Sequence, residues 1–515
     1  MSEDNSDRIS GGKILALLAM CLTMLLIAND ISAMNVALPS IERDFHSDIS
    51  TMQWVINAYA LFTAMTIVAG GALADMYGRR RIFFIGAVIF AVMSFVGGIA
   101  TSDYMLIGAR ALMGIGGALL WPSVLGITFD LLPRNKAALA GGLIIGAAGL
   151  GQAIGPVVGG TLTQYLSWRW IQYINIPIAV SAMGIAWWQV KESHISSIRK
   201  RIDIPGIIAL SLGLVLLLFA LDQANSWGWT DWRILLSFAI SALSIILFVF
   251  IERAAGDNAL IPSEIIQNRK FISSCVAVSL IMPTFFVSLL YLPQLMQKLL
   301  NFSVMSAGLG LLPMMIFYAS FSFLQGRLNE KLGAKVIISL GALCVMVGAF
   351  LLSRVTSGFT YQSLIPGMVV IGLGMGLFLS SNVTAGVSSL DPSRASLAGG
   401  LLFMFQIAGG ALGLGLTTTL FVSSSRSVLE SDLADAGLHL SGEELGMAEG
   451  LLSGTESSAT LLNQIGYENA DKITSIVSDA FLSGIKSGFL LDSLLAIAGF
   501  VIVVMYVGSK LKSKN

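Results

Sequence analysis

The sequence predicts an all-α membrane protein with fourteen transmembrane helices, arranged as two six-helix bundles with two further helices inserted between them. Three observations predict this fold class: an apolar composition, a regular series of apolar segments and an internal repeat. Of the 515 residues, 55% are hydrophobic and 12% are charged, whereas a soluble domain carries about 25% charged residues. The formal net charge of zero excludes the overall basic field expected of a nucleic-acid-binding protein.

Fourteen segments are long and apolar enough to cross a bilayer, since a helical span needs about 20 mostly apolar residues. They are expected at 14–37, 53–74, 82–101, 104–131, 138–165, 171–190, 204–221, 233–251, 271–293, 304–325, 335–353, 363–387, 395–422 and 487–508. The first is too long for the apolar region of a signal peptide, so we expect it to be retained. The longest gap is the polar, acidic segment 423–486, which is expected to be a loop.

The distribution of basic residues predicts the orientation of the chain, because cytoplasmic loops are enriched in Lys and Arg. With the N-terminus placed in the cytoplasm, 21 of the thirty Lys and Arg residues lie in inner segments, 8 lie in outer segments and Arg110 lies within a span. This bias predicts that both termini are cytoplasmic and that segment 423–486 is external.

An internal repeat relates the two halves of the chain. Residues 137–143 read AALAGGL, and residues 395–401, 258 positions later, read ASLAGGL. At similar offsets the second predicted span matches the tenth and the fourth matches the twelfth. Parallel repeats about an axis along the membrane normal are typical of two-bundle secondary transporters, which hold substrate near the midplane between the bundles.

The repeat and the loops predict four parts of the chain. Residues 1–13 form a cytoplasmic tail, and 14–190 form the N-terminal six-helix bundle. Residues 191–252 form a cytoplasmic linker and the two inserted helices. Residues 253–515 form the C-terminal six-helix bundle with the external loop 423–486.

Five motifs in order resemble those of a known transporter family. The loop 71–81, the fourth span around Arg110 and the glycine-rich segment 151–160 resemble motifs of the major facilitator superfamily, although Met113 replaces a common glutamine. Residues 30–39 and 168–177 resemble the fourteen-helix drug:proton antiporters of the EmrB/QacA type. The resemblance covers nearly the whole chain, and it implies the major facilitator fold and transport driven by a proton gradient.

Asp30 and Arg110 are the candidate proton-coupling residues. Asp30 lies inside the first span, where an ionised carboxylate costs about 2.5–3.5 kcal/mol and usually has a function. We interpret it as a proton carrier that can pair with Arg110 when ionised; a structural polar contact between helices is the alternative. Arg110 lies at a similar depth in the fourth span, and its alternative role is to snorkel to the outer headgroups. Its counterpart in the second half is Met368, so the polar machinery is concentrated in the first bundle.

Two further motifs are candidate moving parts. The loop after the second span is interpreted as a latch that closes the cytoplasmic face, with plain positive-inside anchoring as the alternative. Its residues are Gly71, Asp75, Gly78, Arg79 and Arg80, with Glu330 and Gly333 as a weaker copy in the second half. The fifth span is interpreted as a bendable, tightly packed contact between the bundles, and ordinary small-residue packing is compatible with this interpretation. Its residues are Gly151, Gly155, Pro156, Gly159 and Gly160.

A substrate cavity between the bundles is expected to be lined by apolar and aromatic side chains. The candidates are Met34, Tyr59, Trp121, Phe285, Phe286, Phe378 and Gln406. Simple core or lipid-facing positions are the alternative for each, because sequence alone does not orient these helices. We expect no cofactor and no metal site, since the three cysteines and three histidines show no ligand spacing.

The sequence favours proton-coupled efflux of hydrophobic or amphipathic, often cationic, small molecules across a bacterial cytoplasmic membrane. A dedicated exporter of one metabolite, lipid or antibiotic is the first alternative, and a membrane sensor or scaffold on a transporter fold is the weaker one. No G-x-x-x-x-G-K-[ST] loop occurs, which excludes direct use of ATP by this chain, and no feature indicates an enzyme. We expect a functional monomer, and a periplasmic adaptor protein as a partner if the cell has two membranes.

The lack of acidic residues within the second bundle predicts the number of protons exchanged per transport cycle. The second bundle is expected to lack any clear intramembrane acid, because the tenth predicted span, 304–325, and the thirteenth, 395–422, contain no acidic residue. Asp130 and Asp222 lie near the ends of their spans and are expected to be interfacial. If Asp30 is the only acid reached from the cavity, one proton is exchanged per cycle. Monovalent or neutral substrates are then expected to be exported better than divalent ones.

Overall fold

The computed structural model describes residues 10–47, 49–133, 136–193, 203–436 and 467–507. Its helices are α1 (Gly11–Phe45), α2 (Ile49–Tyr77), α3 (Arg79–Gly98), α4 (Asp103–Leu131), α5 (Ala137–Tyr165), α6 (Arg169–Gln189), α7 (Ile204–Trp227), α8 (Trp232–Ala255), α9 (Ser263–Gln267), α10 (Arg269–Leu300), α11 (Val304–Leu309), α12 (Leu312–Leu332), α13 (Ala334–Ser353), α14 (Tyr361–Val387), α15 (Ala395–Asp435) and α18 (Tyr467–Ile502). Short helical turns lie at Gly256–Asn258 (η2), Pro392–Arg394 (η3) and Val503–Val507 (η4). No strand occurs in these ranges, which confirms the all-α class.

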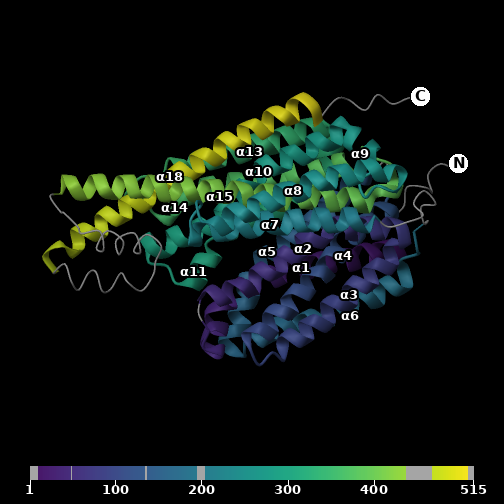
Figure 1. The fold of residues 1–515 in the computed structure, drawn as a ribbon, viewed down its shortest axis with the longest axis horizontal. Helices are drawn as coiled ribbons and strands as arrows, with labels where there is room; N and C mark the ends of the chain where they lie inside the picture. The colour runs from purple at the N-terminus through teal and green to yellow at the C-terminus, as the bar shows by residue number, and fades with distance from the viewer. Residues whose placement is uncertain (1–9, 48, 134–135, 194–202, 437–466, 508–515) are drawn as a thin grey trace.

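The fourteen predicted spans correspond to fourteen long helices within the described ranges. Thirteen of these are long and apolar enough to span a membrane. The remaining one, α6, has 21 residues but is more polar, because it contains Arg169, Gln172 and Asn175. Figure 1 shows the described chain beginning and ending at the same end of the molecule, as an even number of spans requires.

The tenth predicted span, 304–325, differs from the structure. It is divided into α11 and α12, and α12 continues to Leu332. The break has a local cause, because Gly310 ends α11 and Pro313 occupies the first turn of α12, where its missing N–H costs nothing. Gly333, with φ of 85°, ends α12 in a backbone conformation that favours glycine.

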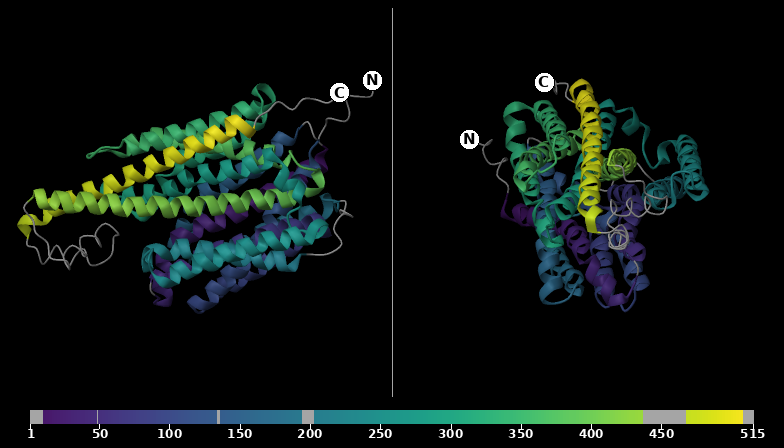
Figure 2. Two further views of the ribbon diagram at one scale, coloured as in Figure 1. Left: turned by 45° about the horizontal axis from the view of Figure 1, so that its top comes forward. Right: turned by 90° about the vertical axis from the view of Figure 1, so that its left-hand side faces the viewer.

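The predicted loop 423–486 was too long at both ends. Helix α15 continues to Asp435, and α18 begins at Tyr467; residues 437–466 lie outside the described part of the chain. The extensions are amphipathic, so a test for uniformly apolar segments misses them. Leu429 and Phe481 are buried, and α15 packs against α18. Figure 2 shows these two helices extending together beyond the other helices at one end.

The packing of helices repeats between the two halves, which confirms the predicted duplication. In the first half α4 packs against α2 and α3, and α1 packs against α5. In the second half α14 packs against α12 and α13, and α10 packs against α15. Glycines mark the same contact in each: a Cβ on Gly86 would lie 2.9 Å from the Gly116 carbonyl oxygen, and one on Gly341 would lie 2.8 Å from that of Gly374. Such close contacts exclude larger side chains.

The two bundles meet through equivalent pairs of helices, α5 with α12 and α15 with α2. The repeated AxLAGGL segments lie in these interfaces. A Cβ on Gly142 would approach the Ser322 carbonyl oxygen to 2.7 Å, and one on Gly400 would approach that of Ile67 to 2.8 Å. Helices α7 and α8 form a pair, and α7 packs beside α2 and α15. The inserted helices therefore lie to one side of the two six-helix bundles, as the teal pair in the right-hand view of Figure 2 shows.

Candidate functional site

A buried ion pair joins the first and fourth spans. The guanidinium Nη1 of Arg110 donates to Asp30 Oδ2, and both side chains are completely buried. Arg110 also donates from Nε to the Val55 carbonyl oxygen at 3.2 Å, and its guanidinium carbon lies 4.5 Å from the centre of the Tyr59 ring. Arg110 therefore points into the bundle instead of towards headgroups, and it is held by α1, α2 and its own helix.

Sequence reasoning did not assign a role to Asn175, yet this residue completes the site. Its Nδ2 donates to Asp30 Oδ1 at 2.8 Å, so both oxygens of the carboxylate accept a hydrogen bond. Asn175 Nδ2 also lies 3.0 Å from Ser94 Oγ, which donates to the Gln172 carbonyl oxygen at 2.7 Å. The sequence signals were that Gln172 and Asn175 are amides within a predicted span and that both lie in the segment 168–177, which resembles the antiporters.

Several buried polar atoms around the pair have no partner among the described residues. They are Arg110 Nη2, Tyr59 Oη, Asn29 Oδ1 and Asn175 Oδ1. Buried polar groups are nearly always hydrogen-bonded, so an unpartnered group calls for an explanation. Spare donors and acceptors beside an ion pair can receive a water molecule, a proton or a polar substrate group.

The loop after α2 connects the first bundle to the second. Asp75 lies at the end of α2 and accepts from the backbone N–H of Ser396 at 3.3 Å and of Leu397 at 2.8 Å. These are orphan donors of the first turn of α15, where an anion is favoured. A Cβ on Gly71 would come within 2.6 Å of the Ser396 carbonyl oxygen. The absence of a side chain at Gly71 therefore permits the close approach of α2 to the start of α15.

Arg79 adds a second link across the interface. It pairs with Asp75 at 2.9 Å and with Asp130 at 2.6 Å, and its Nη2 donates to the Pro392 carbonyl oxygen at 2.6 Å. Gly78, with φ of 105°, permits the sharp turn into α3. Asp130 was expected to be merely interfacial; it is half-exposed, but it is also a partner of Arg79.

Arg80 and the segment after α6 hold the start of α3. Glu192 accepts from the backbone N–H of Arg80 at 3.0 Å and of Arg81 at 3.2 Å, so it caps α3. The Arg80 side chain donates to the Trp187 carbonyl oxygen at 2.9 Å. Glu192 had no sequence signal, because it follows α6 and reaches α3 only through tertiary packing. In the second half the copy is weaker, since Glu330 is exposed.

The glycine face of α5 packs against α1, which carries Asp30. A Cβ on Gly151 would approach the Leu25 carbonyl oxygen to 2.5 Å, and one on Gly159 would approach that of Ala33 to 2.5 Å. A Cβ on Gly155 would meet Ser32. At the far end Pro156 faces Gly308, and Gly160 faces Met305, which belongs to α11. This motif therefore contacts α1, which carries Asp30, and the second bundle together.

The predicted cavity residues lie in different surroundings. Trp121 of α4 lies 4.1 Å, centroid to centroid, from Phe403 of α15, across the bundle interface. Tyr59 belongs to the Arg110 site. Phe285 packs on Tyr318. In the second bundle, Phe286 lies beside Gly410 and Phe378 lies beside Gly341. Met34 is buried with Val55 and Trp168, and Gln406 is half-buried on α15.

The second bundle contains an embedded acid, so the premise of a single intramembrane acid was wrong. Asp492 of α18 is completely buried and accepts from Thr417 Oγ1 at 3.1 Å. It lies in the predicted span 487–508, which the comparison of the tenth and thirteenth spans left out. The expected preference for monovalent and neutral substrates loses its structural basis and stays untested.

Several known proteins with similar sequences are named for resistance or export. The chain is 31% identical over 418 residues to a puromycin resistance protein of Streptomyces alboniger, covering 80% of this chain and 82% of that protein. It is 28% identical over 495 residues to the tetracenomycin C resistance and export protein of Streptomyces glaucescens, covering 95% and 90%. It is 29% identical over 495 residues to multidrug resistance protein 3 of Bacillus subtilis, covering 95% and 94%.

Solved structures share the fold at low sequence identity. The crystal structure of the human organic anion transporter MFSD10 matches with a TM-score of 0.61 and 14% identity, covering 95% of this chain and 99% of that one. Residues 20–414 match the Major Facilitator Superfamily. With the repeated packing of the two bundles and the motifs placed above, this match shows that the chain belongs to the Major Facilitator Superfamily.

Proposed function

We propose that this chain exports hydrophobic or amphipathic, often cationic, small molecules from the cell in exchange for protons. The observation that carries the proposal is the buried pair of Asp30 and Arg110, completed by Asn175. A carboxylate in this position is held by donors on both oxygens, and protonation would remove its charge and release Arg110. The relatives named for resistance and export support the direction of transport.

The coupling of proton binding to helix movement follows from the helices that supply the hydrogen-bond donors to Asp30. Asp30 lies on α1, Arg110 on α4 and Asn175 on α6, so neutralising Asp30 loosens the contact among three helices. The glycine face of α5 transmits a shift of α1 to the second bundle, because it packs on both. At the other end Asp75 and Arg79 hold the bundles together, and these bonds must break for that side to open.

A dedicated exporter is the second candidate function. Among the relatives are a cephamycin export protein of Amycolatopsis lactamdurans, a probable actinorhodin transporter of Streptomyces coelicolor and a riboflavin transporter of Clostridioides difficile, each named for one compound. The experiment is growth and efflux profiling with ethidium, puromycin, tetracenomycin C and riboflavin. Protection against several compounds supports a broad exporter, and a single affected compound supports a dedicated one. Loss of pH-driven movement of every compound from proteoliposomes would favour a sensor or scaffold.

We further propose a bacterial cytoplasmic membrane location, no enzymatic activity and a functional monomer that has a periplasmic adaptor only in cells with two membranes. Protons and the exported compound are the expected ligands, without a cofactor. Detergent-solubilised protein measured by light scattering would test the monomer. Co-purification with an adaptor from such a cell would test the partner.

We expect both termini to be cytoplasmic. A reporter fused near Ser441 should be external, and one fused after Lys514 should be cytoplasmic; both positions lie outside the described residues. The reason is the excess of Lys and Arg in the proposed inner segments. Alkaline phosphatase and green fluorescent protein fusions give complementary signals, and the same side for both positions would contradict the orientation.

We expect Asp75→Asn to weaken the closed latch. The amide keeps one acceptor oxygen but loses the charge that pairs with Arg79 and faces the first turn of α15, and hydrogen bonds to charged groups contribute about 1.5–3 kcal/mol each. Spin labels on the exposed residues Tyr77 and Leu332 should show longer distances, measured by double electron–electron resonance.

Glu330→Gln is the matched control for the latch, because Glu330 is the exposed counterpart in the second half. It should leave the distance distribution as in the wild type. An unchanged distribution in Asp75→Asn would contradict the latch and support positive-inside anchoring.

A further inference from the structure

Asp492 is a buried acid that the proposed mechanism does not use. It lies in α18, and its side chain is completely buried. Its Oδ1 accepts from Thr417 Oγ1 at 3.1 Å, and its Oδ2 has no hydrogen-bond partner among the residues that the structure describes. Asp30, by contrast, has donors on both oxygens and an arginine beside it. The two buried acids therefore lie in different electrostatic surroundings.

No described positive charge lies against Asp492. Lys298 of α10 sits 4.7 Å from the centre of the Phe481 ring, and Phe481 is about 16 Å from Asp492 along α18 at 1.5 Å per residue. Lys486 precedes Asp492 by six residues, which places it about 120° away around the helix axis. Neither is positioned to form an ion pair with the carboxyl group.

The helices packed around α18 present hydroxyl groups near this level. Helix α15 contributes Thr417, and α10 contributes Tyr291, whose hydroxyl donates to Thr418 Oγ1 at 2.9 Å. On α13, Cys344 packs against Gly374 of α14 instead of Asp492. The remaining charges of α13, Lys335 and Arg354, lie at its two ends. An ionised Asp492 would thus be compensated by one hydroxyl donor.

This environment favours the neutral acid. A buried carboxylate without a paired charge is strongly disfavoured, and such a group takes up a proton instead. The cost of ionisation would fall if α18 moved enough to bring Asp492 to water or to a cation. Asp492 therefore has the property required of a proton carrier, which is a charge state that depends on conformation.

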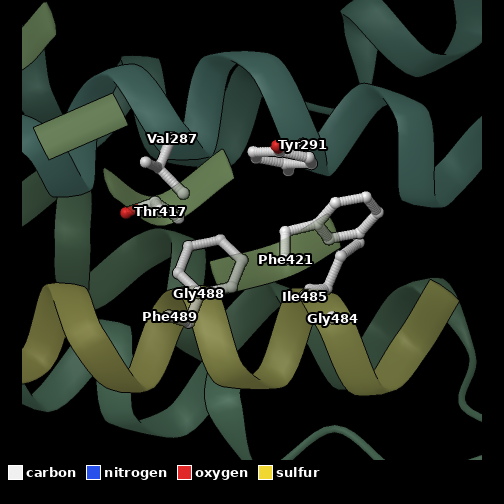
Figure 3. Close-up of a pocket in the computed structure, with 8 residues that line it drawn as sticks. All are labelled: Val287, Tyr291, Thr417, Phe421, Gly484, Ile485, Gly488 and Phe489. Carbon is white, nitrogen blue, oxygen red and sulfur yellow. The ribbon is translucent and has the colours of Figure 1, made fainter. Parts of the chain in front are cut away.

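The packing next to Asp492 links the acid to the contact between α15 and α18. A small pocket begins one helical turn away, lined by Val287, Tyr291, Thr417, Phe421, Gly484, Ile485, Gly488 and Phe489. Figure 3 shows the aromatic rings gathered between α10 and α18, with Thr417 beside them. A Cβ on Gly488 would lie 2.8 Å from Thr417 Cγ2. Because Thr417 lines the pocket and also donates to Asp492, a shift of α18 on α15 changes the one hydrogen bond that the described residues give this acid.

We propose that Asp492 is a second proton-binding site, located in the C-terminal bundle, which holds its proton in this conformation and releases it when α18 moves relative to α15. The site binds a proton whether or not a drug is transported. Its consequence for transport rests on the proposed function: with Asp30, the chain would carry two exchangeable protons per cycle, one in each bundle.

Infrared spectroscopy of the purified full-length protein in lipid tests the bound proton. The wild type should show a carboxylic acid C=O band that persists near neutral pH, where exposed acids are ionised. Asp492→Asn should remove one component of this band. Thr417→Val should keep the component and move it to higher frequency, because the C=O loses its hydrogen bond; this variant decides the question if the Asn variant does not fold.

Asp479→Asn is the matched control, since Asp479 lies on the same helix and accepts from Ser357 at the surface. It should leave the band unchanged. A band that is identical in the wild type, Asp492→Asn and Thr417→Val would overturn the proposal.

The second measurement is the number of protons exchanged per ethidium in proteoliposomes. We expect the ratio to fall by half in Asp492→Asn, and an unchanged ratio would overturn the release step. If no ethidium moves at all, the proposed function fails for this probe, while the infrared result still decides whether Asp492 binds a proton.

Discussion

Replacing Asp30 by Asn is expected to reduce proton-driven efflux to the level of membranes without the protein, while insertion and expression are retained. Asparagine keeps the size and the hydrogen bonds to Arg110 and Asn175 in part, but it cannot bind or release a proton. Efflux of ethidium from energised vesicles, with and without a pH gradient, is the measurement. Exchange of bound ethidium across the membrane without a gradient should persist, because it does not require a proton.

Asp44→Asn is the control for this experiment, because Asp44 is an exposed acid on the same helix. It pairs with Arg169 at 2.6 Å, and hydrogen bonds from Arg169 and Trp168 hold the pKa of Asp44 below its usual value. The pair is therefore present at neutral pH and is lost only as the pH falls through this lowered value. Asp44→Asn should transport like the wild type. Normal energised efflux from Asp30→Asn would refute the proton-carrier role.

Replacing Arg110 by Lys is expected to lower efflux by about 10-fold or more, although the charge is kept. The guanidinium serves Asp30, the Val55 carbonyl group and the face of Tyr59 together, and an ammonium on a flexible stem cannot reproduce this planar geometry. Loss of one hydrogen bond to a charged group costs about 1.5–3 kcal/mol, and about 1.4 kcal/mol corresponds to a tenfold change. Initial rates of pH-driven ethidium efflux, normalised to the amount of protein, provide the measurement.

Arg169→Lys makes the same substitution in a partly exposed ion pair. Such pairs contribute about 0–1 kcal/mol, so we expect efflux close to that of the wild type. Equal losses in Arg110→Lys and Arg169→Lys would mean that the substitution disturbs folding in general, and would contradict a special role for the buried arginine.

The fold class followed from sequence because lipid imposes strong constraints. Each span must satisfy its backbone polar groups internally and remain apolar for about 20 residues, so span positions can be counted. The predicted helix boundaries were wrong where a helix leaves the apolar core or breaks within it. The amphipathic extensions of α15 and α18 were assigned to a loop, and the break before α12 was missed because Gly310 and Pro313 lie within an apolar run.

The candidate site was predictable where one residue is unusual by itself. Asp30 and Arg110 are charged residues within predicted spans, and Gly78 is a glycine in a turn. Each can therefore be recognised from the sequence without knowledge of its neighbours in space. Ser94 and Glu192 have none, because hydroxyls and interfacial acids are common at such positions. Asn175 lies in the segment 168–177, but nothing in that segment indicates that its amide meets Asp30. Asp492 did have a signal, as an acid within the predicted span 487–508, so the expectation that the second bundle lacks an intramembrane acid was wrong on the sequence itself.

The sequence by itself determined the membrane environment, the fourteen spans, the duplication and the identity of the first charged pair, because each depends on composition or spacing along one chain. Only the tertiary structure decided which polar groups meet. Asp75 accepts from Ser396 and Leu397, more than three hundred residues away, and Asp492 accepts from Thr417 alone within the described part of the chain. The physical reason is that the charge state of a buried acid depends on the donors and charges within a few ångströms of it. That set is fixed by the rotation and depth of every neighbouring helix, which apolar sequence leaves undetermined.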